Sequence, residues 1–177
     1  MPTFTVRLAT AADLGAIRDI YNYYVTHSTC TYQIELETVD ERVAWFRERS
    51  AKHPATVAED SGGAVVGWAS LSPWKSRCGY AWAAEASVYI HHDHHRRGIG
   101  KALLLDLIER ARAAGLHTII GGASSDQTAS LALQYALGFK EMGVFREVGR
   151  KFDRWLDVTY TQLVLSENTN SVQPTNR

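Results

Sequence analysis

The chain has 177 residues, of which 45% are hydrophobic and 21% charged, with 19 basic and 19 acidic side chains. This composition is that of a single globular domain and excludes a disordered, collagen-like or repeat protein. A formal net charge of zero also argues against a general nucleic-acid binder, which needs a basic excess to neutralise phosphates.

The first part of the chain carries local signals for a strand, two helices and a hairpin. Thr10 to Asp13 has the pattern of a capping box, which starts a helix. Asp60 to Gly63 has the composition of a tight turn between two strands. In order, the predicted elements are a strand with Phe4, Val6 and Leu8, a helix after Asp13, a helix from Val39 to about Arg49, and strands at Thr56–Glu59 and Ala64–Leu71.

Residues 81–90 predict a strand with two different faces. One face carries apolar side chains and the other polar ones, as the alternation of a strand requires. A short polar loop then leads to Gly98-Ile99-Gly100 and to a helix that Gly115 ends. The first face holds Trp82, Ala84, Ala86, Val88 and Ile90, and the second holds Glu85, Ser87, Tyr89 and His91.

The remaining elements complete a chain in which strands and helices alternate. They are a strand at Thr118–Gly122, a helix at Thr128–Leu137 that ends at Gly138, and strands at Lys140–Phe145 and Leu156–Leu165. The order predicts one α/β (α+β) domain with a mixed sheet over residues 1–166. Residues 167–177 are polar, with one apolar side chain, and predict a disordered tail.

The segment His95–Lys101 places two glycines and three cations where a strand turns into a helix. Free backbone N–H groups and the positive end of the helix converge there, which favours a phosphate group. A P-loop would need Ser or Thr at Ala102, and a Rossmann turn would need Gly or Ala at Leu103. A pyrophosphate cradle of another type therefore remains, beside the simpler alternative of a turn that uses glycine only for backbone freedom.

At this loop the chain resembles the GCN5-related N-acetyltransferases, whose acetyl-CoA signature is Arg or Gln, two variable residues, Gly, any residue, then Gly or Ala. The resemblance covers about residues 7–165 and implies the GNAT fold, a central mixed and mostly antiparallel sheet flanked by helices. It sharpens toward the phosphinothricin and methionine sulfone N-acetyltransferases. The segments that carry it are Pro73–Arg77, Tyr80–Trp82 and Glu85–Tyr89, with Lys151, Trp155 and Asp157 later in the chain.

The resemblance implies acetyl-CoA as co-substrate. Backbone groups of Arg96 to Lys101 would hold the pyrophosphate, and main-chain groups of Val88 to Ile90 would meet the pantetheine arm. Three positions depart from the family pattern, because His95 replaces Arg or Gln, Gln127 replaces a common Asn, and Gln134 replaces Tyr or His. The implied cofactor-binding residues are Val88, Tyr89, Ile90, His95, Arg96, Arg97, Gly98, Ile99, Gly100, Lys101, Gln127 and Ser130.

Acetyl transfer to an amine needs a neutral amine, a site for the oxyanion and a route for the thiolate to leave. Glu85 is the candidate base, acting through water, although a glutamate on a solvated strand face is the simpler interpretation. A backbone N–H near Tyr89 would stabilise the oxyanion. Tyr135 is a candidate acid for the thiolate, or a residue of the core.

A loop with Lys75 and Arg77 among aromatic residues suits a small carboxylate, unless its cations are merely solvated. The resemblance favours the α-carboxylate of an amino acid, and it implies that Lys151, Trp155 and Asp157 complete the pocket, across a homodimer interface. The implied substrate-binding residues are Trp74, Lys75, Ser76, Arg77, Tyr80, Glu85, Ala86 and Ser87.

The predicted function is therefore transfer of the acetyl group of acetyl-CoA to the α-amine of a small amino acid or analogue of the phosphinothricin, methionine sulfone or methionine sulfoximine type. Two alternatives remain: a peptide or protein N-acetyltransferase, and a non-catalytic acetyl-CoA-binding module. The retained Glu85 speaks against the second alternative, and the aromatic loop near Trp74 speaks against the first.

The run His91–His95 suggests a metal site, but neighbouring residues of an extended loop point apart, so we expect no physiological metal. Cys30 and Cys78 are too few for a disulfide framework. No stretch has the roughly 18 apolar residues of a membrane helix, and the first residues do not resemble a signal peptide. We expect a cytoplasmic protein with no membrane or nucleic-acid partner.

Overall fold

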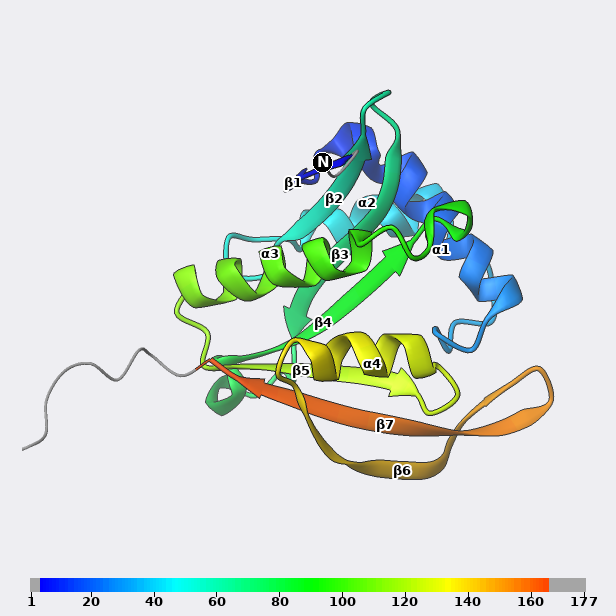
Figure 1. Cartoon of the computed structure of the whole chain (residues 1–177), viewed down its shortest axis with the longest axis vertical. Helices are drawn as coiled ribbons and strands as arrows, with labels where there is room; N and C mark the ends of the chain where they lie inside the picture. The colour runs from blue at the N-terminus through cyan, green and yellow to red at the C-terminus, as the bar shows by residue number, and fades with distance from the viewer. Residues whose placement is uncertain (1–3, 166–177) are drawn as a thin grey trace, which may run out of the picture.

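Seven strands form one sheet in the order β1-β2-β3-β4-β5-β7-β6 in this computed structural model, which describes residues 4–165 (Figure 1). Strands β4 and β5 are parallel, and the other neighbours in this order are antiparallel, as predicted. The predicted tail 167–177 lies outside the described residues. The strands are β1 (Phe4–Leu8), β2 (Ala55–Asp60), β3 (Val65–Pro73), β4 (Ala83–Ile90), β5 (Thr118–Ser124), β6 (Lys140–Lys151) and β7 (Arg154–Val164).

Four α-helices belong to the described part of the chain, and none of them is long and apolar enough to cross a membrane. The predicted capping box before the first helix is present, since a carboxylate oxygen of Asp13 accepts from the N–H of Thr10 at 2.7 Å. It shapes a short 3-10 turn, Ala11–Asp13, from which the helix continues. The helices are α1 (Leu14–His27), α2 (Val39–Arg47), α3 (Ile99–Ala113) and α4 (Thr128–Ala136).

The helices cover the two faces of the sheet in pairs (Figure 1). Helix α3 buries Leu103, Leu104 and Leu107 in the larger of two apolar clusters, and side chains of α4 pack against the same cluster. Helices α1 and α2 cover the opposite face, where a second cluster contains Ile17 and Trp68. Side chains of the central strands therefore alternate between two separate apolar clusters.

Strand β4 alternates as predicted, but its second face is not uniformly polar. Ala84 is buried under α3, whereas Tyr89 stacks on Trp68 with ring centroids 4.8 Å apart, in the layer beneath α1 and α2. The alternation identified the two faces but not the helix that covers the second one. Trp82 is a further correction, because it precedes the strand and is 60% exposed.

Strands β6 and β7 are longer than predicted and meet at a two-residue turn. Phe152 and Asp153 have φ angles of 49° and 56°, as a turn between two twisted strands requires. Such turns usually contain Asn-Gly or Asp-Gly, so Phe-Asp gave no turn signal. The segment 146–151, in which four of six residues are charged, also hid the strand. The strand loses its regular register between Phe145 and Gly149.

Candidate active site

Strands β4 and β5 run side by side for only part of their length and then separate (Figure 1). Their ladder begins with the pair Ala83–Thr118 and ends with the pair Ala86–Gly121. Strand β4 continues to Ile90 without a partner on this side among the described residues. An unpaired strand edge can bind an extended ligand through main-chain hydrogen bonds.

The hydrogen-bond pattern shows which groups of β4 lie at this edge. In an antiparallel pair, alternate residues bond to the partner strand. The carbonyl of Ala83 accepts from the N–H of Trp74 at 3.3 Å, and the N–H of His91 donates to Val66 at 2.9 Å. The odd-numbered residues of β4 therefore bond to β3.

The main-chain N–H and C=O groups of the even-numbered residues point away from β3. Trp82 is an example, because its carbonyl accepts from the N–H of His117 at 2.8 Å. The main-chain groups of Val88 and Ile90 consequently lie along the free edge. Tyr89 does not present its main chain there, because its N–H and C=O face β3. The backbone N–H expected near Tyr89 is thus that of Val88 or Ile90.

Helix α1 closes one end of the free edge through Tyr24. The hydroxyl of Tyr24 donates to the carbonyl of Ile90. Because a hydroxyl has one proton, it accepts from Nε2 of His95, 2.6 Å away. The predicted cofactor residue His95 is thereby tied to α1, and the N–H of Ile90 has no partner within residues 4–165.

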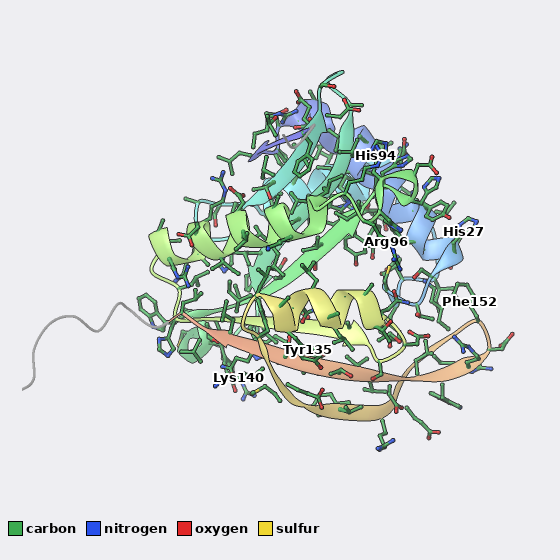
Figure 2. All side chains as sticks on the ribbon, in the orientation of Figure 1. His27, His94, Arg96, Tyr135, Lys140 and Phe152 are labelled. Atoms are coloured by element: carbon green, nitrogen blue, oxygen red, sulfur yellow. The ribbon has the colours of Figure 1, made fainter. Side chains whose placement is uncertain are left out.

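The glycine loop has the backbone geometry of an anion cradle. Arg96 and Gly98 have positive φ angles of 60° and 82°, which curl the chain just before α3 (Figure 2). The first intrahelical bond runs from the N–H of Ala102 to the carbonyl of Gly98 at 3.1 Å. The preceding N–H groups of the helix are therefore available to a pyrophosphate.

The side chains predicted around this loop are less uniform than its backbone. Arg96 and Lys101 are exposed, while Arg97 lines a cavity of about 240 Å³ beside the turn between β2 and β3. Gln127 donates to the hydroxyl of Thr29 at 2.7 Å, and Ser130 accepts from Gln134 at 3.3 Å. Backbone groups therefore carry most of the predicted cofactor site.

Glu85 lies half-buried on β4, on the face beneath α1 and α2. Burial raises the pKa of its carboxyl, and the charge of Lys75 acts in the opposite direction. One carboxylate oxygen lies 3.5 Å from the point that a Cβ on Gly122 would occupy, so this glycine leaves space for the carboxylate. A carboxyl group with a raised pKa is suited to accept a proton from an amine.

Aromatic rings from separate elements lie beside Glu85. A ring carbon of Tyr160 lies 3.2 Å from the same point above Gly122. The ring of Tyr160 meets Trp74 and Phe145 edge to face, with centroids 5.7 and 5.2 Å apart. Burial and the charge of Glu85 both raise the pKa of Tyr160. The sequence did not point to Tyr160 or Phe145, because alternation identifies a face of β7 but not what lies opposite it.

The predicted substrate loop is divided between two places. Trp74 belongs to the rings around Tyr160, and Nζ of Lys75 lies 4.7 Å from the centroid of Trp74. Tyr80 instead lines a separate cleft with Trp82 and His117. Ser76 and Arg77 are exposed in the loop between these places, and Ser87 shares the face of Glu85.

Ala86 is a correction among the predicted substrate contacts. Its side chain packs against the core beneath α3, on the face opposite Glu85. The family motif contains this alanine next to Glu85 in sequence, but neighbours along a strand point to opposite faces. Ala86 therefore contributes to the core and to the ladder with β5.

Tyr135 lies outside the group around Glu85. Its hydroxyl donates to Glu141 of β6 at 2.7 Å, and the side chain is 41% exposed. Gln134 is buried instead, where its amide oxygen accepts from Thr161. One residue on a helix is a rotation of about 100°, so the buried Gln134 turns Tyr135 away from the sheet.

Lys151, Trp155 and Asp157 have other partners within the chain. The buried ammonium of Lys151 donates to the carbonyls of Ser28 and Thr31, at 2.7 Å each, and more weakly to Tyr24 at 3.3 Å. An oxygen of Asp157 accepts from the N–H of Glu147 at 2.8 Å. Trp155 is 62% exposed. These contacts stabilise the β6–β7 hairpin and do not shape the surroundings of Glu85.

The histidine run is a 3-10 turn, His92–His94, and not the extended loop assumed from the sequence. The turn brings ligand atoms of His91, His92 and Asp93 within 4.8 Å of one another. The rings of His91 and His92, however, are stacked at 20° with centroids 4.4 Å apart. Lone pairs of nearly parallel rings do not converge on one ion, as a tetrahedral site requires.

Comparison with known proteins gives a consistent result. Residues 17–139 match the acetyltransferase (GNAT) family model. The L-methionine sulfoximine/L-methionine sulfone acetyltransferase of Salmonella typhimurium is 39% identical over 93% of this chain and 96% of its own length. The phosphinothricin N-acetyltransferase of Streptomyces viridochromogenes is 35% identical over 89% of this chain and 85% of its own.

A solved structure agrees with the sequence matches. It is a Salmonella typhimurium protein with its cofactor acetyl-CoA, and it superposes with a TM-score of 0.90 at 39% identity, covering 94% of this chain and 96% of the other. The free edge of β4 and the cradle before α3 are the features of this chain that fit such a cofactor.

Proposed function

The chain belongs to the acetyltransferase (GNAT) family, and we propose that it transfers the acetyl group of acetyl-CoA to the α-amine of a small amino acid or analogue of the methionine sulfone, methionine sulfoximine or phosphinothricin type. The observation that carries the proposal is the position of Glu85. Its half-buried carboxyl lies on the same strand whose next residues present the free main-chain edge.

Acetyl-CoA supplies a thioester carbonyl for direct attack by the amine. Main-chain groups of Val88 and the N–H of Ile90 align the pantetheine arm, and N–H groups at the start of α3 hold the pyrophosphate. An arm bound along this edge would bring the thioester toward the splayed ends of β4 and β5, on the strand that carries Glu85.

Glu85 accepts the proton of the substrate ammonium, directly or through water, and so makes the amine nucleophilic. The amine nitrogen then forms a bond to the thioester carbonyl carbon, and the N–H of Val88 or Ile90 stabilises the oxyanion. The C–S bond breaks as the carbonyl reforms, and the second proton of the nitrogen passes through water to the departing thiolate, which yields the amide and the CoA thiol. A free thiol has a pKa near 8.5, so the leaving group needs little help from an acid.

Lys75 is the cation placed to bind the α-carboxylate of the substrate. Its charge acts on Glu85, and its ammonium lies on the ring of Trp74. An amino acid has its amine and carboxylate on the same carbon. A base and a cation side by side are therefore complementary to that pair of groups.

The test is thiol release from acetyl-CoA with methionine sulfone, methionine sulfoximine, phosphinothricin, ordinary amino acids and a short peptide as acceptors. Glu85→Gln keeps the shape of the side chain and removes the base, so kcat should fall by about a hundredfold or more. Glu109→Gln is the matched control, because Glu109 is 69% exposed on α3 and pairs with Arg112.

Three results would contradict the proposal. Unchanged turnover in Glu85→Gln would remove Glu85 as the base. Turnover of the peptide alone would favour a peptide N-acetyltransferase. Cofactor binding without thiol release on any acceptor would favour a non-catalytic acetyl-CoA-binding module.

We also propose that the protein acts as a homodimer in the cytoplasm. Strand β6 is an edge of the sheet, and exposed apolar side chains lie along the β6–β7 hairpin, among them Met142, Phe145, Val148 and Trp155. Such a patch marks an interaction surface. Light scattering at micromolar concentration should give the mass of a dimer, and a monomer would contradict this.

The proposed cytoplasmic location is supported by the free Cys30 and Cys78, which suit a reducing compartment.

A further inference from the structure

Given the proposed function, on which this inference rests, we propose that Arg49 and Ser72 are positioning residues of the reaction. Arg49 turns the hydroxyl of Ser72 toward Glu85. This hydroxyl holds the water molecule through which Glu85 accepts the proton of the substrate ammonium.

Arg49 is a nearly buried cation that neutral groups hold in place. It follows α2, and its side chain is 9% exposed. Its Nε donates to the carbonyl of Trp45 at 3.1 Å, and its Nη1 donates to the carbonyl of Leu71 at 3.0 Å and to Oγ of Ser72 at 3.1 Å. In the described part of the chain, the one carboxylate within 4 Å of the guanidinium is that of Glu48, which lies 3.8 Å away and is 76% exposed. Burial of this charge is costly, so its fixed position beside Ser72 calls for a role.

The bond from Arg49 determines where the proton of Ser72 lies. A guanidinium has donors and no acceptor, whereas a hydroxyl has one proton to donate and lone pairs that accept. Oγ of Ser72 is therefore the acceptor in this bond, and its own O–H points away from Arg49. The hydroxyl is left as a donor on the face of the sheet that also carries Glu85.

Ser72 and Glu85 lie directly opposite each other in the ladder between β3 and β4. Opposed residues of an antiparallel pair carry their side chains on the same face, with Cβ atoms about 4.5–5.5 Å apart. The carboxylate of Glu85 leans toward Gly122 of β5, and within residues 4–165 the hydroxyl of Ser72 makes no direct hydrogen bond to it. A single water molecule can bridge two polar groups that are separated in this way.

A water in this position has the partners that it needs to carry a proton. A bound water makes about three hydrogen bonds. This one accepts from the hydroxyl of Ser72 and from the substrate ammonium, and it donates to Glu85. The ammonium proton passes to the water oxygen as a proton of the water passes to Glu85, so the water is restored and the amine becomes neutral.

The other charged and titratable groups that face Glu85 come from the loop after β3 and from β7. The charge of Lys75 favours the ionised carboxylate, and Tyr160 lies on the other side of it, above Gly122. Both groups are retained when Ser72 is replaced. A change in the pH profile of a Ser72 variant therefore reports on the hydroxyl.

The hydroxyl and the guanidinium can be removed separately. Ser72→Ala removes the hydroxyl and Ser72→Thr retains it, and Ser61→Ala is the matched control because Ser61 is exposed in the turn between β2 and β3. Arg49→Met removes the guanidinium, with Arg47→Met at the exposed end of α2 as its control. Thermal unfolding and acetyl-CoA binding verify that each variant is folded.

The experiment measures kcat and kcat/KM against pH for methionine sulfone, or for whichever amino acid acceptor turns over fastest. Ser72→Ala should lower kcat about tenfold, as expected for the loss of one hydrogen bond, with an unchanged KM for acetyl-CoA. It should also move the acid limb of kcat/KM to higher pH, because the ionised form of Glu85 loses support. Ser72→Thr and both controls should retain most of the activity.

Arg49→Met should act in the same direction as Ser72→Ala. If Arg49 acts through Ser72, the two changes are not additive, and the double variant should be no slower than Ser72→Ala alone. An effect of Arg49→Met that persisted in full in the Ser72→Ala background would overturn the role of Arg49.

Other results would overturn the role of Ser72. One is an unchanged kcat and pH profile in Ser72→Ala; if Glu85→Gln were inactive at the same time, the proposed function would stand. Another is Ser72→Thr as slow as Ser72→Ala, which would assign the effect to packing instead of the hydroxyl. Absence of thiol release by the wild type on every acceptor would refute the proposed function itself.

Discussion

Lys151 provides the sharpest test of how the structure holds the segment after α1. Its side chain is 5% exposed, and its ammonium donates to three main-chain carbonyls, those of Tyr24, Ser28 and Thr31. Burial lowers the pKa of this ammonium, so the contacts must offset a cost of desolvation. Lys151→Met keeps most of the volume and removes all three donors.

The magnitude follows from the contacts. The carbonyl of Tyr24 keeps a second donor, the N–H of Ser28 at 3.1 Å. The carbonyls of Ser28 and Thr31 lose the bonds of 2.7 Å from Lys151. Each carbonyl left without a partner costs about 1–3 kcal/mol. Removing the buried ammonium also removes its desolvation cost, which offsets part of this loss. We therefore expect the free energy of unfolding to fall by about 3 kcal/mol. For a chain of this size, this lowers Tm by about 6–12 °C.

Urea and thermal unfolding of Lys151→Met measure this loss directly. Lys140→Met is the control, because Lys140 is an exposed lysine at the start of the same strand (Figure 2). It should stay within about 0.5 kcal/mol of the wild type. If Lys151→Met also stayed within that range, the three hydrogen bonds would not stabilise the fold as argued.

Four further predictions concern the site and its surroundings. Burial raises the pKa of Glu85 above 4.5 in the folded protein, so kcat/KM should rise with pH as Glu85 ionises. The contribution of Glu85 to the stability of the fold should fall as the pH rises from 4.5 through that raised pKa. Glu85→Gln should abolish both trends. Tyr135→Phe should change kcat by less than about threefold, whereas loss of a general acid would cost about a hundredfold. Gly121→Ala should destabilise the protein by about 1–3 kcal/mol in urea unfolding, because the added Cβ would lie 2.2 Å from the amide oxygen of Gln134. Dialysis against a chelator should leave thiol release unchanged, and a loss restored by zinc would reopen the histidine turn as a metal site.

Local features of the sequence predicted most of the secondary structure. The capping box at Thr10–Asp13, the turn at Asp60–Gly63 and the strand, glycine loop and helix around Gly98 depend on backbone preferences and on hydrogen bonds a few residues apart. The glycines and cations before α3 predicted an anion cradle, and the family motif added acetyl-CoA as its ligand and Glu85 as the candidate base. The β6–β7 turn was missed because Phe152 and Asp153 adopt positive φ angles without the usual residues.

What the tertiary structure decided is which residues meet. The register between β3 and β4 selects Val88 and Ile90 rather than Tyr89 for the free edge. The packing of Gln134 turns Tyr135 away from the site. Tyr160 comes to lie beside Glu85 because β7 pairs with β5 opposite Gly122. Local conformation is encoded by neighbouring residues, but the position of a side chain relative to distant strands depends on register and packing, which involve the whole chain.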